Sequence, residues 1–287
     1  MKNIIKNHFK FILIGMLVIA ISIIIGVYKY ENSTYQIPVL MYHHFLTGEE
    51  EDAYQTDKGY CITTENFDKQ MEYLHDNGYT CLTMEQLYEY KKGKIDVPQK
   101  SFAITIDDGL LSSVDRAKPI LAKYGFSAAV FVIGSAANPT TASTFDPTVH
   151  YQYIGIDVIN ERDNVLEYGS HTYDMHKIIN GQKSLETMSY AQMLEDAKKE
   201  KSLINSDYIA YPYTTYSRDL IKSLKAAGYK MAFRGNEKKT VKYENLYLTS
   251  RIGATDDMQK FYDIFETNKY DFKPTLKQFL SDFLKTF

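Results

Sequence analysis

A short apolar run that ends in two adjacent acids is the most restrictive feature of this sequence. Residues 101–109 read SFAITIDDG, in which Asp107 and Asp108 follow directly after four closely spaced apolar residues. Such a run is typical of a buried strand, and Gly109 is a residue at which the chain can turn. A strand that is apolar on both faces favours a parallel sheet covered by helices. We therefore expect both carboxylates at the carboxyl end of a buried strand.

The pair of acids admits two interpretations. Asp-Gly is common in ordinary turns, so the pair could simply end the strand. Neighbouring carboxylates also resist ionising together unless a cation or a positive partner is present, so one of them could bind a metal while the other acts as a base. The remaining strand ends decide between these two interpretations.

Length and composition indicate a folded chain without a nucleic-acid partner. The 287 residues include 44% hydrophobic and 24% charged ones, which suits one large core or two modest ones and excludes disorder as a description of the whole. A net charge of -3 gives no global basic surface, so we predict no binding to nucleic acid. The 25 Tyr and 15 Phe are mostly core residues, with some available to stack on sugar rings.

The N-terminal segment predicts a membrane anchor. Residues 11–28 form an uncharged apolar run that is long enough to cross a bilayer as a helix. Three lysines precede it, Lys2, Lys6 and Lys10, and place the N-terminal side in the cytoplasm. A cleaved signal peptide is the alternative, but the run is long and no small-x-small site follows it. The predicted division is a cytoplasmic tail (1–10), a transmembrane anchor (11–28), a linker (29–36) and one extracellular domain (37–287).

Strands and helices are expected to alternate over the remainder of the chain. The expected strands are Ile37–Tyr42, Tyr79–Thr83, the run before Asp107, Ala128–Ile133, Val165–Tyr168, Tyr208–Tyr211, Lys230–Phe233 and Leu246–Ser250. The expected helices are Thr64–Asn77, Met84–Lys92, Ser113–Tyr124, Ile154–Arg162, Tyr190–Leu203, Arg218–Ala227 and Thr275–Phe287. We expect a surface loop over Gly48–Lys58 and a solvated charged face on the helix Tyr190–Leu203.

This alternation predicts an α/β fold. A strand, a helix and another strand in succession imply a right-handed crossover in a parallel sheet. Polar residues gathered after the strands fit a closed or partly closed β/α barrel better than an open sheet. Cys61 and Cys81 flank the first helix of this domain, where they could form a disulfide or remain as two free buried thiols.

Chemically active residues follow four of the expected strands. In a barrel, these strand ends meet on one face. One carboxylate and two imidazoles would leave open positions on a divalent metal for water and substrate. A lone histidine is more often structural, but two histidines in a Gly-Ser loop beside a paired acid favour a catalytic metal site. The four groups are His43 with His44, Asp107 with Asp108, His171 with His176, and Pro212 with Tyr213.

Three of these stretches resemble the motifs of the polysaccharide deacetylases, carbohydrate esterase family 4. TIDDG at 105–109 resembles their TFDDG-type motif, SHTYDMH at 170–176 their histidine metal motif, and AYPYTTYS at 210–217 their Pro-Tyr motif. The resemblance extends from Ile37 to Arg251. The histidine spacing and the sequence YHHF are more similar to the branch that acts on poly-β-1,6-N-acetylglucosamine, the biofilm adhesin, than to the peptidoglycan branch.

The resemblance implies a distorted β/α barrel of the NodB-homology type and a bound divalent metal, zinc with cobalt or nickel as alternatives. It makes Asp107 the general base and Asp108, His171 and His176 the metal ligands. The backbone N–H of Tyr213 would help to hold the oxyanion. The implied reaction is removal of acetyl from N-acetylhexosamines, in which an acid must also protonate the departing amine.

Two departures from the family pattern concern the base and the acid. The chain has Ala210 where the family motif has the arginine that pairs with the base, and no late hydrophobic-x-x-His motif lies near Ile252–Asp256. We therefore predict that His43 is the general acid. His44 is the competing candidate, and strand alternation would let only one of the two face the site.

The resulting prediction is a single-pass membrane enzyme that N-deacetylates an extracellular N-acetylglucosamine polysaccharide, most simply poly-β-1,6-N-acetylglucosamine. A deacetylase of peptidoglycan or of another chitin-like glycan is one alternative. A membrane-anchored glycan-binding protein without catalysis is another, but a pure binder has no need for the complete set of Asp107 and three metal ligands.

Overall fold

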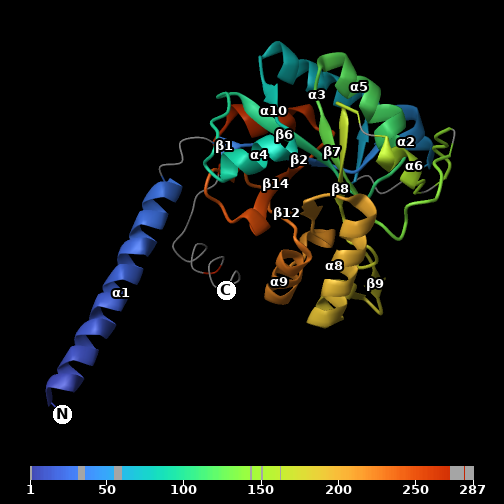
Figure 1. Cartoon of the computed structure of the whole chain (residues 1–287). Coiled ribbons are helices and arrows are strands. Elements are labelled where there is room, and N and C mark those ends of the chain that lie inside the picture. Colours follow the sequence, from blue (N-terminus) through green and yellow to red (C-terminus); the bar gives the residue numbers. More distant parts are fainter. Residues whose placement is uncertain are drawn as a thin grey trace.

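Seven parallel strands close into a barrel in the order in which they occur along the chain (Figure 1). The computed structural model describes residues 2–31, 36–54, 60–142, 144–149, 151–161, 163–271 and 281. β2 pairs with both β6 and β14, and these two pairings close the ring. The barrel strands are β2 (Val39–Tyr42), β6 (Ser101–Ile106), β7 (Ala128–Val132), β8 (Leu166–Ser170), β11 (Tyr208–Ala210), β12 (Met231–Gly235) and β14 (Thr249–Gly253).

Helices connect these strands and cover the outside of the barrel. They are α3 (Thr64–Asp76), α4 (Met84–Lys91), a π-helical turn with α5 (Ser113–Ala117 and Lys118–Tyr124), α6 (Ile156–Asn160), α7 (Ser184–Thr187), α8 (Tyr190–Ile204), α9 (Arg218–Ala227) and α10 (Met258–Glu266). Short strands extend the barrel: β1 (Gln36–Ile37) with β13 (Thr240–Val241), β3 (His44–Leu46) with β4 (Cys61–Thr63), β9 (Ile178–Ile179) with β10 (Gln182–Lys183), and β5 (Thr80–Cys81) beside β6. The parallel barrel confirms the predicted α/β fold.

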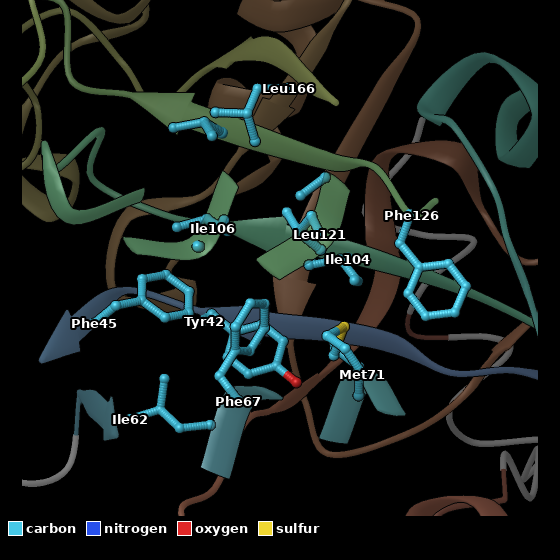
Figure 2. Packing of buried hydrophobic residues seen from close by; sticks show 14 of the residues in the cluster. Tyr42, Phe45, Ile62, Phe67, Met71, Ile104, Ile106, Leu121, Phe126 and Leu166 are labelled. Atoms are coloured by element: carbon cyan, nitrogen blue, oxygen red, sulfur yellow. The ribbon is translucent and has the colours of Figure 1, made fainter. Parts of the chain in front are cut away.

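β6 shows how the sequence divides its apolar residues between two cores. Phe102, Ile104 and Ile106 point outward into a cluster with α3 and α5, whereas Ala103 belongs to a second cluster inside the barrel. Figure 2 shows Ile104 and Ile106 among labelled side chains of α3, α5 and β2. Every residue of β6 is buried, because helices cover one face and the barrel interior the other.

A helix occupies part of the segment that was expected to be a loop. α2 spans Gly48–Tyr54, within the predicted loop Gly48–Lys58. Thr47 and Glu50 form a capping box, because the Thr47 N–H donates to Glu50 Oε2 (2.8 Å) and the Glu50 N–H donates to Thr47 Oγ1 (3.2 Å). Acidic residues in the first turn also favour the positive end of the helix dipole. The loop prediction was wrong because this cap was overlooked.

Other elements differ from expectation in detail. The side chain that caps α3 is Thr63 rather than Thr64. Tyr79–Thr83 shortens to β5, and a 3₁₀ turn (Leu246–Leu248) precedes β14. Cys61 and Cys81 are free thiols, so the disulfide alternative is not formed. The predicted C-terminal helix Thr275–Phe287 lies outside the described residues apart from Ser281.

The charged face predicted for α8 is only partly solvated. Met193 and Ala197 are buried, and Asp196 and Glu200 are buried with them. The simple assignment of every charged residue to the solvent was therefore wrong for these two carboxylates. A buried carboxylate needs a specific partner, because leaving it without one is costly.

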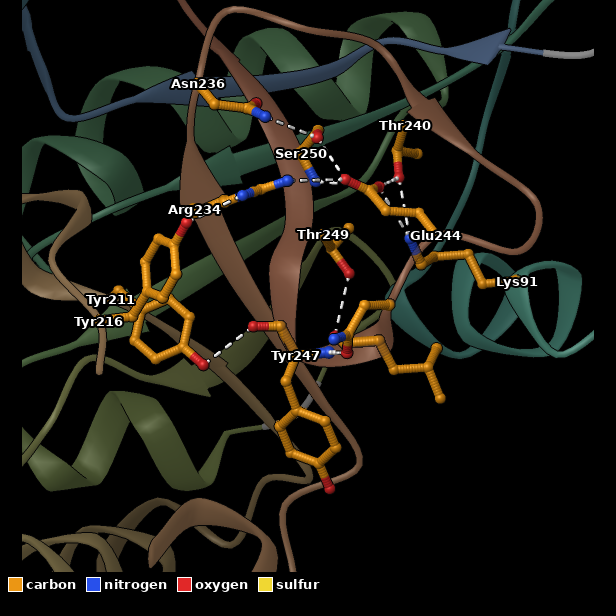
Figure 3. A network of polar contacts seen from close by, with 12 residues as sticks. Lys91, Tyr211, Tyr216, Arg234, Asn236, Thr240, Glu244, Tyr247, Thr249 and Ser250 are labelled. Atoms are coloured by element: carbon orange, nitrogen blue, oxygen red, sulfur yellow. Dashed lines mark hydrogen bonds and ion pairs between the residues drawn. The ribbon is translucent and has the colours of Figure 1, made fainter. Parts of the chain in front are cut away.

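A buried network of charges ties α4 to the barrel wall at β12 and β14 (Figure 3). Lys91 Nζ lies 3.0 Å from Glu244 Oε2, and Arg234 Nη2 lies 3.5 Å from Glu244 Oε1. Arg234 also donates a hydrogen bond of 2.9 Å to the hydroxyl of Tyr216, in the segment after β11. Two buried cations therefore share one buried carboxylate, and loss of that carboxylate would remove an ion pair from each of them.

The N-terminal helix α1 spans Lys2–Glu31. None of the helices in the described part of the chain combines the length and the apolarity needed to span a bilayer. Within the predicted anchor, the side chains of Leu13, Val27 and Tyr28 lie outside the described residues. The anchor over residues 11–28, the tail, the linker and the domain limits stay predictions.

Candidate active site

The carboxyl ends of the barrel strands open into a cleft of about 720 Å³. Of the eight residues that the sequence singled out for chemistry, all but Pro212 line this cleft: His43, His44, Asp107, Asp108, His171, His176 and Tyr213. Tyrosines from separate loops form much of the remaining wall, together with one lysine. They are Tyr60, Tyr151, Tyr153, Tyr211 and Lys183. The structure thus brings together residues that are up to 170 positions apart in the sequence.

A strained turn after β6 sends the two acids to different partners. Asp108 and Gly109 both have left-handed backbone conformations, with φ of 74° and 73°. A side chain at Gly109 would come within 3.1 Å of Val132, so glycine suits this position for both space and conformation. Asp108 has no such freedom, and non-glycine residues with this conformation concentrate at functional sites.

Arg251 forms a bidentate ion pair with Asp107 inside the barrel. Its Nη1 lies 2.6 Å from Asp107 Oδ1, and its Nη2 lies 2.8 Å from Asp107 Oδ2. Nη1 also donates to Thr105 Oγ1 (3.0 Å), whose hydroxyl donates to the carbonyl of Leu40 (2.7 Å). This arrangement fixes the plane of the Asp107 carboxylate, because a guanidinium and a carboxylate match in geometry.

The guanidinium of Arg251 is fully buried between aromatic rings. Its central carbon lies 5.7 Å from the ring centre of Phe131 and 6.0 Å from that of Phe233. Burial alone would raise the pKa of Asp107. Arg251, with contributions from His171 and His43, lowers this pKa by a larger amount, so it lies well below its ordinary range. Asp107 is therefore ionised at neutral pH.

Three donor atoms converge beside this pair. His171 Nε2 and His176 Nε2 each lie 3.4 Å from Asp108 Oδ1. The three possible ligand atoms are all within 4.8 Å of one another. Two imidazoles and one carboxylate form a typical site for zinc or a similar divalent ion, with positions left open for water and substrate.

The hydrogen bonds around these donors fit a bound cation. His171 Nδ1 lies 3.0 Å from the carbonyl oxygen of Ala210, which can only accept, so Nδ1 carries the proton and a neutral His171 directs a lone pair from Nε2. Asp108 Oδ1 faces that lone pair, is buried, and has no hydrogen-bond partner in the described part of the chain. A cation between these atoms would satisfy both.

Electrostatics also favours a positive charge at this point. Burial alone would lower the pKa of His171. The negative charges of Asp107 and Asp108 raise this pKa by a larger amount, so it lies above its ordinary value. Burial, followed by the neighbouring His171, lowers the pKa of His176 to about 4. His176 is therefore neutral at pH 7 and can offer a lone pair, as a metal ligand requires.

His43 and His44 both line the cleft but have different partners. His43 Nε2 lies 4.0 Å from Asp107 Oδ2, and its ring meets Tyr60 edge-on. His44 Nδ1 lies 2.7 Å from the hydroxyl of Ser112. The expectation that only one of the two could face the site was wrong, because β2 ends before His43 and β3 begins at His44, so the pair does not belong to one continuous strand.

Tyr213 lies on a strained segment directly after β11. Tyr213 and the next residue, Thr214, have φ of 53° and 55°. The ring of Tyr213 stacks against His176 with 4.4 Å between the ring centres. Lys183 from β10 donates to Thr215 Oγ1 (2.8 Å) and approaches the Tyr213 carbonyl (3.5 Å), which ties this segment to the neighbouring hairpin.

Sequence reasoning missed Arg251 as a site residue, although the expected last strand ended there. A single charged residue in an otherwise uncharged strand was the available signal, since an unpaired buried charge is rare. The arginine that the family motif has at position 210 is missing, as expected, and Arg251 pairs with Asp107 from another strand. The tyrosines of the cleft come from irregular loops, where sequence patterns carry little structural information.

Comparison with known proteins gives this cleft a family context. Residues 94–232 match the family model described as "Polysaccharide deacetylase". A poly-beta-1,6-N-acetyl-D-glucosamine N-deacetylase of Staphylococcus aureus (strain MRSA252) is 29% identical over 215 residues, which cover 70% of each chain. The protein of the same name from Staphylococcus epidermidis (strain ATCC 35984) is 29% identical over 224 residues, or 74% of this chain and 75% of the relative.

Solved structures share the fold. The Streptococcus pyogenes deacetylase PplD in complex with acetate has a TM-score of 0.67 at 21% identity, covering 80% of this chain and 98% of that one. IcaB from Ammonifex degensii has a TM-score of 0.65 at 22% identity, covering 79% and 95%. The three motifs at the cleft all lie within residues 94–232, the part of the chain that matches the polysaccharide deacetylase model, and the barrel has the fold of these solved deacetylases.

Proposed function

We propose that this protein is a metal-dependent enzyme that removes acetyl groups from N-acetylglucosamine residues of an extracellular polysaccharide, poly-β-1,6-N-acetylglucosamine. The observation that carries the proposal is the convergence of Asp108, His171 and His176 beside the Asp107–Arg251 pair in one open cleft. The two staphylococcal relatives support this choice of glycan, since both are named as deacetylases of it. N-deacetylation is hydrolysis of an amide bond.

The roles of the residues follow from their positions. Asp108, His171 and His176 would hold the divalent ion, zinc or alternatively cobalt or nickel, and a bound ion would supply a polarised amide carbonyl and an activated water. Asp107 would accept the proton of that water. Its pairing with Arg251 keeps Asp107 ionised and fixes its direction, although a lowered pKa also makes it a weaker base.

His43 is the general acid in this proposal. It is 16% exposed and lies 4.0 Å from Asp107, so its side chain can reach both the base and the open cleft. Burial lowers the pKa of His43, whereas Asp107 and Asp108 raise it, and the net pKa is below its ordinary value. The protonated form is therefore a minority in the free protein at neutral pH, and the negative charge of Asp107 is what favours it.

Tyr213 would act through its backbone. The stacking of its ring on His176 supports a position beside the metal-ligand loop, where its peptide N–H would stabilise the oxyanion of the tetrahedral intermediate. The surrounding tyrosines offer apolar ring faces against which sugar rings can pack. A protein that only binds glycan would need this wall but not the buried ion pair and the three convergent donors beneath it.

The first prediction tests the activity and its substrate. The purified protein should release acetate from acetylated β-1,6-glucosamine oligomers faster than from peptidoglycan fragments or chitin oligomers. Activity should fall to background after chelation and return with zinc, cobalt or nickel, because the three protein donors leave catalysis dependent on the ion. If acetate release from these glycans persisted after complete removal of metal, the proposal would be contradicted.

The second prediction separates the base from the ligands. Asp107→Asn should abolish turnover while the bound metal is retained, because Asp107 pairs with Arg251 rather than with the three donors. His171→Ala should lose both turnover and metal. Elemental analysis with initial rates measures the two effects, and equal loss of metal in the two variants would show that the roles are wrongly assigned.

The third prediction concerns the acid. His43→Ala should lower kcat by roughly 100-fold or more, with little change in metal content, because the departing amine loses its proton donor. His44→Ala is the matched control, since His44 Nδ1 contacts the hydroxyl of Ser112, whereas His43 Nε2 lies 4.0 Å from Asp107. A normal kcat in His43→Ala with a reduced kcat in His44→Ala would transfer the role to His44.

The fourth prediction concerns location. We propose that residues 11–28 anchor the protein in the cell membrane as a single span with the deacetylase domain outside, supported by the length of the apolar run and by Lys2, Lys6 and Lys10 before it. Protease added to intact cells should then degrade the domain, and the protein should fractionate with membranes. Complete release into the medium would instead indicate a cleaved signal peptide.

A further inference from the structure

Two acidic side chains of α8 are buried beneath the loop that carries both histidine ligands. Asp196 is 8% exposed and Glu200 is fully buried. They are four residues apart and therefore lie on one side of the helix. Glu195, next to Asp196, is exposed. Because burial of a carboxylate is costly unless hydrogen bonds compensate for it, the contacts of these two side chains require explanation.

Asp196 binds the backbone of the histidine loop with both of its carboxylate oxygens. The N–H of Tyr173 donates to Oδ1 (2.8 Å), and the N–H of Asp174 donates to Oδ2 (2.7 Å). Both donors belong to the short stretch between His171 and His176. Hydrogen bonds to an ionised acceptor are among the stronger ones, so this contact holds the loop firmly.

The opposite side of the same loop is held by the segment after β7. The N–H of Gly134 donates to the carbonyl of Thr172 (3.2 Å), and the N–H of Ser135 donates to the carbonyl of Tyr173 (2.8 Å). Thr172 has a φ of 71°, which is unfavourable for a β-branched residue. A strained conformation persists only where its surroundings fix it from several sides, and these contacts do so.

Glu200 contributes less directly. Its Oε1 lies 3.3 Å from the N–H of His171, which also donates to the Val132 carbonyl at 2.7 Å. Its other oxygen faces Gly134 so closely that a Cβ at that position would collide with it. The contact of Glu200 therefore duplicates a bond of the barrel ladder, whereas Asp196 accepts from both the Tyr173 and the Asp174 N–H groups.

We propose that Asp196 is a positioning residue of the metal site, which sets the distance of the His176 donor from those of His171 and Asp108 through the loop backbone. α8 provides a rigid base for this contact, because Met193 and Ala197 of the same helix are buried against the barrel. The inference rests on the proposed function in so far as His171, His176 and Asp108 bind metal. Partners that orient metal ligands typically affect affinity about 10- to 100-fold.

The fifth prediction uses the full chain with zinc as the probe. Zinc affinity is measured by competition with a chromophoric chelator for the unchanged protein, Asp196→Ala, Asp196→Asn and Glu195→Ala. Asp196→Ala should weaken zinc binding by about 10- to 100-fold because both N–H contacts are lost. Asp196→Asn keeps one acceptor oxygen and should lie between Asp196→Ala and the unchanged protein. Glu195→Ala changes an exposed neighbour on the same helix and should bind zinc normally.

Thermal unfolding of the metal-free proteins separates positioning from general stability. If Asp196→Ala unfolds at a lower temperature but its folded form binds zinc as tightly as the unchanged protein, the residue is only structural and the inference is wrong. If Asp196→Ala does not fold, unchanged zinc affinity in Asp196→Asn leads to the same conclusion. Failure of the unchanged protein to bind zinc would overturn the proposed metal site and this inference together, whereas normal binding by both Asp196 variants overturns the inference alone.

Discussion

The ion pair between Arg251 and Asp107 is the interaction on which the rest of the site depends. A carboxylate that is buried inside a barrel is strongly disfavoured unless a cation accompanies it, and Arg251 meets both of its oxygens. The pair joins β14 to the end of β6 across the barrel interior. It therefore fixes the direction of the proposed base and leaves Asp108, the next residue, free to turn toward the histidines.

The small residue at position 210 belongs to the same arrangement. Ala210 shares the inner cluster with Ala103, Ala129, Phe131 and Phe233, so the barrel interior combines small side chains with two large rings. Space left by the alanines suits a long side chain that enters from β14 and lies between the rings. The guanidinium that the family motif has at the last residue of β11 is thus supplied here from a different strand. Ala210 still serves the site, since its carbonyl orients His171.

The sequence predicted the barrel because its signals are local. Apolar strands and capped helices are written in consecutive residues, and α9 begins and ends where its pattern indicated. The site depends on contacts between residues that are distant in the sequence. Only those site residues whose side chains have distinctive chemistry, such as His171 and His176, could be identified from the sequence. Arg251 and Asp196 were overlooked for one reason. Each is a charged residue whose role depends on a buried partner, and no local pattern reveals whether a charge will be buried.

Three kinds of partner thus hold the three parts of the site. A guanidinium holds Asp107, a backbone carbonyl holds His171, and a buried carboxylate holds the loop before His176. The Ala210 carbonyl and the Asp196 carboxylate leave the Nε2 atoms of the two histidines unengaged, because the first uses Nδ1 of His171 and the second acts through the backbone, whereas Arg251 contacts both oxygens of Asp107. The left-handed residues Asp108, Thr172 and Tyr213 lie where these contacts meet, and their strain is tolerated because the barrel fixes them from several directions. The strained loops lower the stability of the fold, and burial of the apolar layers around the barrel offsets this cost. The fold can therefore stay rigid while Asp108, His171 and His176 keep their ligand atoms available.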